Sequence, residues 1–292
     1  MTIRPTFNQG RPLSEDDLHR VAPSIFGDTA SPARSEKFKP IATIEVLRGL
    51  ANEGFFPVSV QEQGSRSFSR RPFTKHVVRL RRFDETRDLK VNDTIAEVVL
   101  KNANDGTAAY SLNAGLFRIA CLNGAVIQTE EFGAERIAHI GERATMDKVI
   151  EGSYKIINRA NEILEAPRDW SKLMLPSSEA YSLAMQVHHR AFKDADDVVR
   201  TPIKVDQLLG VRRAEDKGQD LWTIFNVIQE NVLRGGLEAD SVTTTERWGT
   251  VRTHVRTHAI NAIDRSMKLN IDIFNLASDT YKKLSAPEEV AA

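Results

Sequence analysis

The sequence predicts an α+β protein in which an antiparallel sheet with a basic hairpin packs against a mainly helical C-terminal half. Three short segments, 55–63, 75–83 and 94–102, are rich in β-branched and aromatic residues and are bounded by turn-forming residues. Such segments are typical of an antiparallel meander. After about residue 142, apolar residues instead recur at helical spacing. This change of period along the chain is what predicts the α+β class.

The composition is that of a globular protein without a disulfide framework. The 292 residues are 41% hydrophobic and 27% charged, and 40 basic residues balance 40 acidic ones. The single cysteine, Cys121, excludes an intrachain disulfide and a thiolate zinc site. The polar start MTIRPTFNQG does not resemble a signal peptide, and no stretch approaches the roughly 18 apolar residues of a transmembrane helix. We therefore expect a cytoplasmic protein without a membrane partner.

The chain is expected to contain an arm, a β-rich region, a helical region and a tail. The helical region is expected to pack on the sheet, so that both form one composite domain. The predicted boundaries are 1–40 for the polar N-terminal arm, 41–141 for a helix plus the antiparallel β region, 142–285 for the helical region and 286–292 for the tail.

Three local signals describe the first half in more detail. Ser14 precedes an acidic turn and is expected to cap a short helix within the arm. A second helix is expected to begin at a Thr43 cap and to stop at Gly54. The apolar run 115–122 is too short for its periodicity to separate a strand from a buried helix, so both remain open.

The helical half contains one especially clear helix. Its apolar residues, at 221, 224, 225, 228 and 232, form a continuous stripe. Pro167 is expected to end the first helix of this half, since proline interrupts the helical hydrogen-bond ladder. The helices expected here are 143–167, 177–194, 201–210, 218–236 and 256–284.

This neutral chain concentrates positive charge in one window, RSFSRRPFTKHVVRLRR (66–82). The window holds seven Arg or Lys and no carboxylate. Strand alternation directs Val78 and Leu80 toward a core and the alternate cations toward an exposed face. Alternate residues of a strand lie about 6.6 Å apart, close to the phosphate spacing of an extended single strand. The window is therefore interpreted as a phosphate-binding hairpin with aromatic side chains that stack on bases.

The residues expected to bind nucleic acid come from the strand and from the loop before it. They are Arg66, Phe68, Arg70, Arg71, Phe73, Lys75, Arg79 and Arg81. The alternative is a solvated basic face whose charges pair with acids on adjacent strands, such as Glu62 or Glu97.

A second, weaker anion-binding candidate lies near the C-terminus. Arg252, His254, Arg256 and His258 alternate along TVRTHVRTH, and on a helix the two histidines would share a face. No Glu follows the first histidine, so the zincin motif is absent, and the arginines would repel a metal cation. We expect no metal site.

Three polar residues lie close together on the clearest predicted helix. Asn226, Gln229 and Glu230 lie on it, with Arg212 and Arg213 just upstream. A buried structural network is the first interpretation, because buried polar groups that satisfy one another fix a fold. A subunit contact or an active site remains open.

Three segments together resemble the DUF932 family of phage- and plasmid-type proteins. They are AYSLNAGLFRIACLNGAVI, VRRAEDKGQDLWTIFNVIQENVLRGG and NIDIFNLASDTY, and the resemblance covers roughly residues 40–280. It implies a setting in phages, plasmids and integrative elements, beside DNA-processing and anti-defence genes. It implies no catalytic residues.

The leading hypothesis is a nonenzymatic nucleic-acid-binding protein of a mobile element. It would favour single-stranded DNA, promote annealing or protect strands in recombination without ATP, and assemble as a homo-oligomer. The sequence contains no Walker, GxGxxG or GxSxG motif, and we expect no cofactor and no catalytic residue. Two alternatives stay open: a module that sequesters a host protein, and an enzyme using Asn226, Glu230, Arg213 and His254.

Overall fold

The structure is a computed structural model, and the chain divides into two compact units. The sheet unit comprises Met1–Leu164 and Asn261–Asp264, and the helical unit comprises Glu165–Ile260 and Arg265–Ala292. The α+β class is confirmed. The predicted boundary at residue 141 and the single composite domain stay predictions. The described residues are 6–7, 11–32, 42–65, 67–83, 94–108, 110–118, 124–127, 135–137, 142–158, 160–245 and 249–286.

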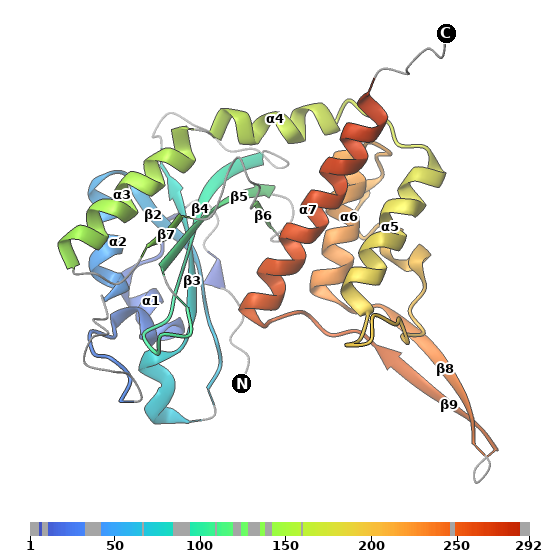
Figure 1. The fold of residues 1–292 in the computed structure, drawn as a ribbon, viewed down its shortest axis with the longest axis horizontal. Helices are drawn as coiled ribbons and strands as arrows, with labels where there is room; N and C mark the ends of the chain where they lie inside the picture. The colour runs from blue at the N-terminus through green and yellow to red at the C-terminus, as the bar shows by residue number, and fades with distance from the viewer. Residues whose placement is uncertain are drawn as a thin grey trace. The chain divides into compact units, whose positions relative to one another are not determined.

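An antiparallel sheet forms the centre of the sheet unit (Figure 1). Its strands follow the order β1-β2-β3-β4-β5-β6, and β7 also pairs with β5. The predicted meander is therefore confirmed, and the first part of the ambiguous run 115–122 is strand; Cys121 lies outside the described residues. The strands are β1 (Thr6–Phe7), β2 (Phe55–Glu62), β3 (His76–Arg82), β4 (Thr94–Asn102), β5 (Tyr110–Arg118), β6 (Gly124–Ile127) and β7 (Glu135–Ile137).

Helices cover one face of this sheet. Alternation along the strands places Val78, Leu80, Leu100 and Leu112 on that face, and all four are fully buried. Figure 1 shows α2 and α3 on this side of the sheet. The predicted direction of Val78 and Leu80 is thus confirmed. The covering elements are α1 (Glu15–Val21), η1 (Pro23–Phe26), α2 (Thr43–Asn52) and α3 (Glu142–Asn158).

The first part of the expected arm belongs to this fold. Ser14 caps α1 as predicted, and its side chain and that of Asp17 form a reciprocal capping box. Leu18 and Ile25 are buried, and the backbone NH of Leu13 donates to a β2 carbonyl at 2.7 Å. Residues 11–32 therefore form part of the sheet unit, because they bury apolar surface against it.

A buried chain of polar side chains lies between α2 and the sheet. Thr43 was expected to cap α2, but it does not. Its hydroxyl instead lies 2.8 Å from His76 Nε2 and 3.0 Å from the Tyr110 hydroxyl. The other ring nitrogen of His76 lies 2.9 Å from the hydroxyl of Ser24 in η1. Asn102 donates to Thr43 at 3.1 Å. This network links α2, η1 and three strands through one buried imidazole.

Aromatic packing organises the helical unit. Trp170 and Phe274 lie with ring centroids 4.9 Å apart, and Trp222 stacks on Phe225 at 5.4 Å. Pro167 lies inside α4, which continues to Trp170, so the predicted helix end was wrong. The elements are α4 (Ala160–Trp170), α5 (Ser177–Phe192), η3 (Val205–Leu209), η4 (Ala214–Asp216), α6 (Leu221–Arg234), β8 (Glu238–Thr245), β9 (Gly249–Arg256) and α7 (Ile263–Ser285), and α4 and α7 each cross the division between the units.

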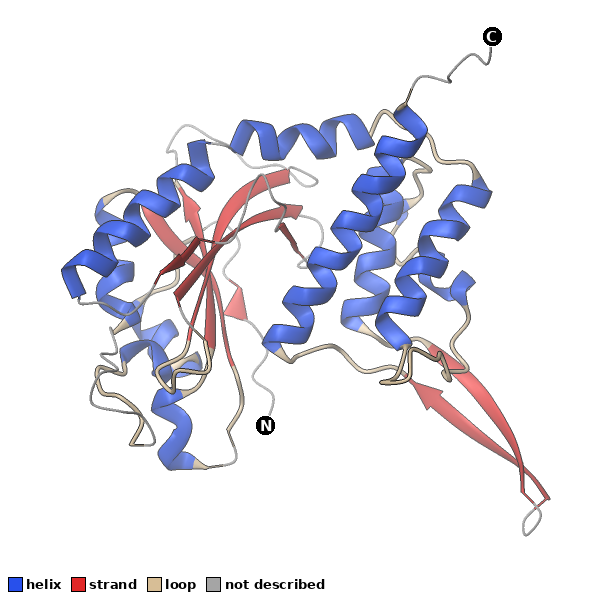
Figure 2. Cartoon of the chain, in the orientation of Figure 1, coloured by secondary structure: helices blue, strands red, loops and turns tan. Residues whose placement is uncertain are grey.

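The helical unit also contains a two-stranded ribbon that the sequence analysis missed. β8 and β9 pair antiparallel over their whole length and extend away from the helices of their own unit (Figure 2). The last helix begins at Ile263 rather than 256. The segment TVRTHVRTH alternates β-branched and polar residues, which is a strand signal.

In the described part of the chain, none of the helices is long and apolar enough to cross a membrane.

The His76 network predicts a pH-dependent stability. Burial lowers the pKa of His76 from 6.5 to about 4, so the folded state holds a neutral ring. A lowered pKa gives stability that is complete above the unfolded pKa and is lost as the pH falls through the folded one. We expect this residue to cost about 3 kcal/mol of unfolding free energy between pH 7 and pH 4. The measurement is urea unfolding against pH for the wild type and His76→Gln; parallel curves would contradict the assignment.

Candidate functional site

The loop between β2 and β3 presents the most exposed part of the basic window. Its 3₁₀ turn η2 (Phe68–Phe73), here called the basic loop, contains two arginines and no carboxylate. Phe68 is 87% exposed, an unusual state for a phenylalanine. Arg70 is exposed too, and it forms no ion pair with another described residue. Arg66, another predicted contact, lies outside the described residues.

The basic loop rests on a close backbone contact. A Cβ atom at Gly27 would lie 2.6 Å from the carbonyl oxygen of Pro72, so only glycine lets the segment after η1 approach the loop this closely. The NH of Asp105 donates to the carbonyl of Phe73 at 3.1 Å. These contacts hold the end of the loop while its first residues remain exposed.

Arg71 lies between solvent and a buried carboxylate. Glu62 has a fully buried side chain, and its Oε1 accepts from the NH of Ser24 at 2.9 Å. Its Oε2 has no hydrogen-bond partner and lies 3.9 Å from Arg71 Nε. Burial raises the pKa of Glu62, and the Arg71 charge is one of the effects opposing this rise. Arg71 therefore balances part of a buried negative charge and is only partly available to a ligand.

The strand arginines were expected on an exposed face, but they do not lie on one. Arg79 Nε lies 2.7 Å from Glu97 Oε2, and Arg81 contacts Glu97 Oε1 through Nε at 2.9 Å and Nη2 at 2.6 Å. Glu97 is fully buried, and the arginine side chains are only 12% and 14% exposed. The alternative named Glu97 on the adjacent strand as a partner, but it expected a solvated face, and these pairs are mostly buried. Burial required a partner here, since an unpaired charge is costly inside a protein.

Lys75 is also buried and paired. Its Nζ contacts Asp264, and Lys101 Nζ lies 3.4 Å from the other oxygen of the same carboxylate. The two lysines and Asp264 all belong to the sheet unit. None of the predicted strand cations Lys75, Arg79 and Arg81 is thus freely exposed. Among the predicted contact residues that the structure describes, the loop residues Phe68 and Arg70 are freely exposed.

The second anion-binding candidate lies on the ribbon. The expectation that His254 and His258 share a helical face is wrong, because His254 lies on β9 and His258 follows it. His254 Nδ1 lies 3.1 Å from Asp240, and Arg256 Nε lies 3.3 Å from Glu238. Arg252 is exposed on the same strand face. Carboxylates across the ribbon therefore offset two of the four candidates.

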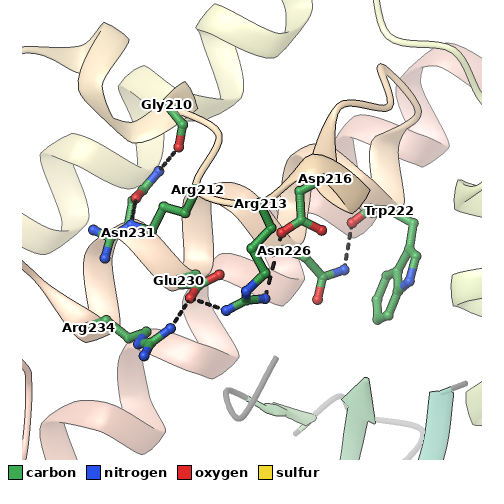
Figure 3. Close-up of polar contacts among 9 residues, drawn as sticks. All are labelled: Gly210, Arg212, Arg213, Asp216, Trp222, Asn226, Glu230, Asn231 and Arg234. Carbon is green, nitrogen blue, oxygen red and sulfur yellow. Dashed lines mark hydrogen bonds and ion pairs between the residues drawn. The ribbon is translucent and has the colours of Figure 1, made fainter. Parts of the chain in front are cut away.

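The polar residues of α6 form a buried network (Figure 3). Glu230 Oε1 accepts hydrogen bonds from both Arg213 and Arg234. Asp216 lies 3.7 Å from Arg213, and Asn226 donates to the carbonyl of Trp222 at 2.7 Å. Figure 3 shows Glu230 placed between its two arginines. The geometry is that of a network joining α6 to the segment before it.

Asn231 and Arg212 extend this network. Asn231 donates to the carbonyls of Leu208 and Gly210 at 2.8 and 2.9 Å and accepts from Arg212 at 2.5 Å. Arg212 also donates to the carbonyl of Gly235 at 2.6 Å. Burial lowers the pKa of Arg212. The alternative enzyme needed His254 beside Asn226, Glu230 and Arg213, but His254 contacts the ribbon carboxylates Glu238 and Asp240.

The sheet face opposite the helices is polar, and the sequence analysis did not assign most of it. Register places Lys101 opposite Ser111, and Val99 between Arg79 and Asn113. Ser111 and Asn113 are buried. Alternation along β4 and β5 was the available signal, but β5 was not recognised as a strand. Within the described residues, no group of three or more His, Cys, Asp or Glu side chains is placed to hold a metal ion.

Comparison with known proteins identifies the family. The profile described as "Domain of unknown function (DUF932)" matches residues 32–270. The chain belongs to the DUF932 family. Two Escherichia coli (strain K12) relatives are UPF0380 protein YfjQ, 34% identical, and UPF0380 protein YafZ, 35% identical; each alignment spans 274 residues, 94% of this chain and 93% of the relative. No solved structure matches the chain.

The three sequence segments that resemble the DUF932 family each coincide with defined elements of this DUF932 protein. The first contains β5 and β6, the second contains η4 and α6, and the third lies within α7. The second segment supplies Arg213, Glu230 and Arg234, so its charged residues meet in one network.

The Glu97 site gives a sharp stability prediction. Glu97→Gln removes the charge that both Arg79 and Arg81 contact, leaving two poorly exposed guanidinium groups without it. We expect a loss of about 3–5 kcal/mol in the free energy of unfolding. Glu45→Gln, which breaks an exposed pair with Arg48, is the control and should change it by less than about 1 kcal/mol. Urea unfolding measures both; equal effects would show that burial of Glu97 does not matter.

Proposed function

We propose that this protein is a nonenzymatic nucleic-acid-binding protein that favours single strands and contacts them through the basic loop. The observation that supports this best is the 87% exposure of Phe68 beside Arg70, in a segment without any carboxylate. An exposed aromatic ring next to an exposed arginine suits a chain that alternates bases and phosphates.

The chemistry of the loop favours single strands over duplexes. Stacking of one base on an aromatic ring contributes about 1–3 kcal/mol and tolerates any sequence, but it needs a base that is not already stacked in a duplex. Arginine adds a planar fork that matches a phosphate group. Phe68 and Arg70 together therefore suit an unpaired nucleotide.

The proposal narrows the set of contact residues. Arg79 and Arg81 both contact Glu97, and Lys75 contacts Asp264, so these three cations are held by carboxylates inside the protein. They support the strand that carries the loop. Phe68 and Arg70 make the primary contacts, Arg71 contributes in part, and Phe73 positions the loop.

The wider setting is proposed from the family resemblance. A phage or plasmid protein of this kind would act in the cytoplasm on single-stranded DNA, in ATP-independent annealing or strand protection. Annealing proteins often work as rings or filaments, and we propose a homo-oligomer here.

A second candidate function is the binding of a host protein. The ribbon favours it, since Val242 and Val251 are exposed on opposite faces of β8 and β9. Exposed apolar side chains on a protruding element suit a protein partner.

The proposed function predicts a salt-dependent affinity that depends on the basic loop. We expect labelled single-stranded DNA to bind more tightly than duplex, with affinity falling between about 50 and 200 mM salt. Phe68→Ala should weaken single-strand binding about tenfold, and Arg70→Gln with Arg71→Gln should also flatten the salt dependence. Fluorescence anisotropy measures these affinities.

Matched variants control for general surface effects. Tyr181→Ala removes another exposed aromatic ring, and Arg20→Gln removes another exposed cation. Neither should change the affinity. Failure of the wild type to bind either polymer at low salt would overturn the proposal, and a complex with a host protein that survives nuclease would then favour the second candidate.

A further inference from the structure

The polar face of the sheet holds two buried groups without partners. Ser111 Oγ and Asn113 Nδ2 have no hydrogen-bond partner, although both residues are buried. Most buried polar atoms in proteins are paired, so each exception needs an explanation. Two such atoms on alternate residues of one strand point to the same side of the sheet.

A lysine with a weak contact lies beside them. Lys101 is directly opposite Ser111 in the register of β4 and β5. Side chains that face each other in this way have Cβ atoms about 5 Å apart, and those of Ser111 and Asn113 lie about 7 Å apart. Lys101, Ser111 and Asn113 can therefore direct their donors toward one small group.

Among the described residues, positive charge exceeds negative charge at this end of the polar face. Lys75 and Lys101 share the carboxylate of Asp264. Lys75 makes the close contact, whereas Lys101 Nζ remains 3.4 Å away. Both lysine side chains are mostly buried, so solvent offsets the remaining charge only in part.

We propose that Lys101, Ser111 and Asn113 form a binding site for a phosphate monoester group. A compact anion with several acceptor oxygens pairs with one ammonium, one hydroxyl and one amide at the same time. The ester belongs either to a small phosphorylated molecule or to the 5′ end of a nucleic-acid strand. Both offer the same dianionic group.

The α6 network is a weaker candidate for an anion site. Arg213 Nη1 also lacks a hydrogen-bond partner, and two arginines, Arg213 and Arg234, contact Glu230 or Asp216. Arg234, however, is 48% exposed, so solvent offsets its charge. Ser111 Oγ and Asn113 Nδ2 on the polar face are buried, so solvent does not satisfy them in this way.

Variants with opposite effects test the site. Asn113→Ala and Lys101→Met remove donors and should each weaken binding of inorganic phosphate about tenfold. Asp264→Asn removes a competing carboxylate and should strengthen it, a result that a purely structural role does not predict. Lys172→Met, at an exposed position, should leave it unchanged. Isothermal titration calorimetry on the full chain at low salt measures the affinities of the wild type and the four variants.

Two further measurements complete the test. Asn113→Ala should leave the melting temperature without phosphate unlowered, since it breaks no hydrogen bond of Nδ2, so weaker binding is not a folding defect. A 5′-phosphorylated oligonucleotide that binds more tightly than its unphosphorylated form, with the difference lost in Asn113→Ala, assigns the ester to a strand end. Phosphate binding without that difference assigns it to a small molecule.

The site is independent of the basic loop. Phe68→Ala should leave phosphate affinity unchanged, so the two proposals fail separately. Absence of phosphate binding to the wild type, or equal affinity in wild type, Asn113→Ala and Asp264→Asn, would overturn the phosphate site.

Discussion

One buried carboxylate determines what the basic hairpin can do. Glu97 contacts Arg79 and Arg81 with its two oxygens, and this allows two guanidinium groups to lie side by side on the inner part of a sheet. Without it, alternation would place unpaired charges where solvent hardly reaches. The same contacts keep both guanidinium groups away from solvent, so the exposed positive charge of the window lies in the loop before β3.

The basic loop depends on this sheet and on the segment that packs beside it. Gly27 permits the close approach to Pro72, while Glu62 and Ser24 connect the loop to the buried His76 network. Rigid support of an exposed loop is a common arrangement for binding residues. Phe68 is thus exposed on a loop whose neighbouring residues are fixed. The loop can therefore bind a ligand with little loss of conformational freedom.

Much of the sheet unit could be predicted from local patterns. Alternation located β2, β3 and β4 and the core positions Val78 and Leu80, and Ser14 showed its cap, since these features depend on neighbours in sequence. Exposure of Arg79 could not be predicted in the same way, because it depends on Glu97, which lies on another strand. The ribbon was missed because His254 and His258 lie four residues apart, a spacing that also fits a helix.

The central claim is that the exposed residues of the basic loop, and not the paired strand arginines or the ribbon, meet a single strand. Hydrogen–deuterium exchange with and without single-stranded DNA tests this most directly, since it reports every region at once. The account predicts slower exchange of amides in Phe68–Phe73 and unchanged exchange in β8 and β9. Slower exchange in the ribbon, with the basic loop unchanged, would contradict it.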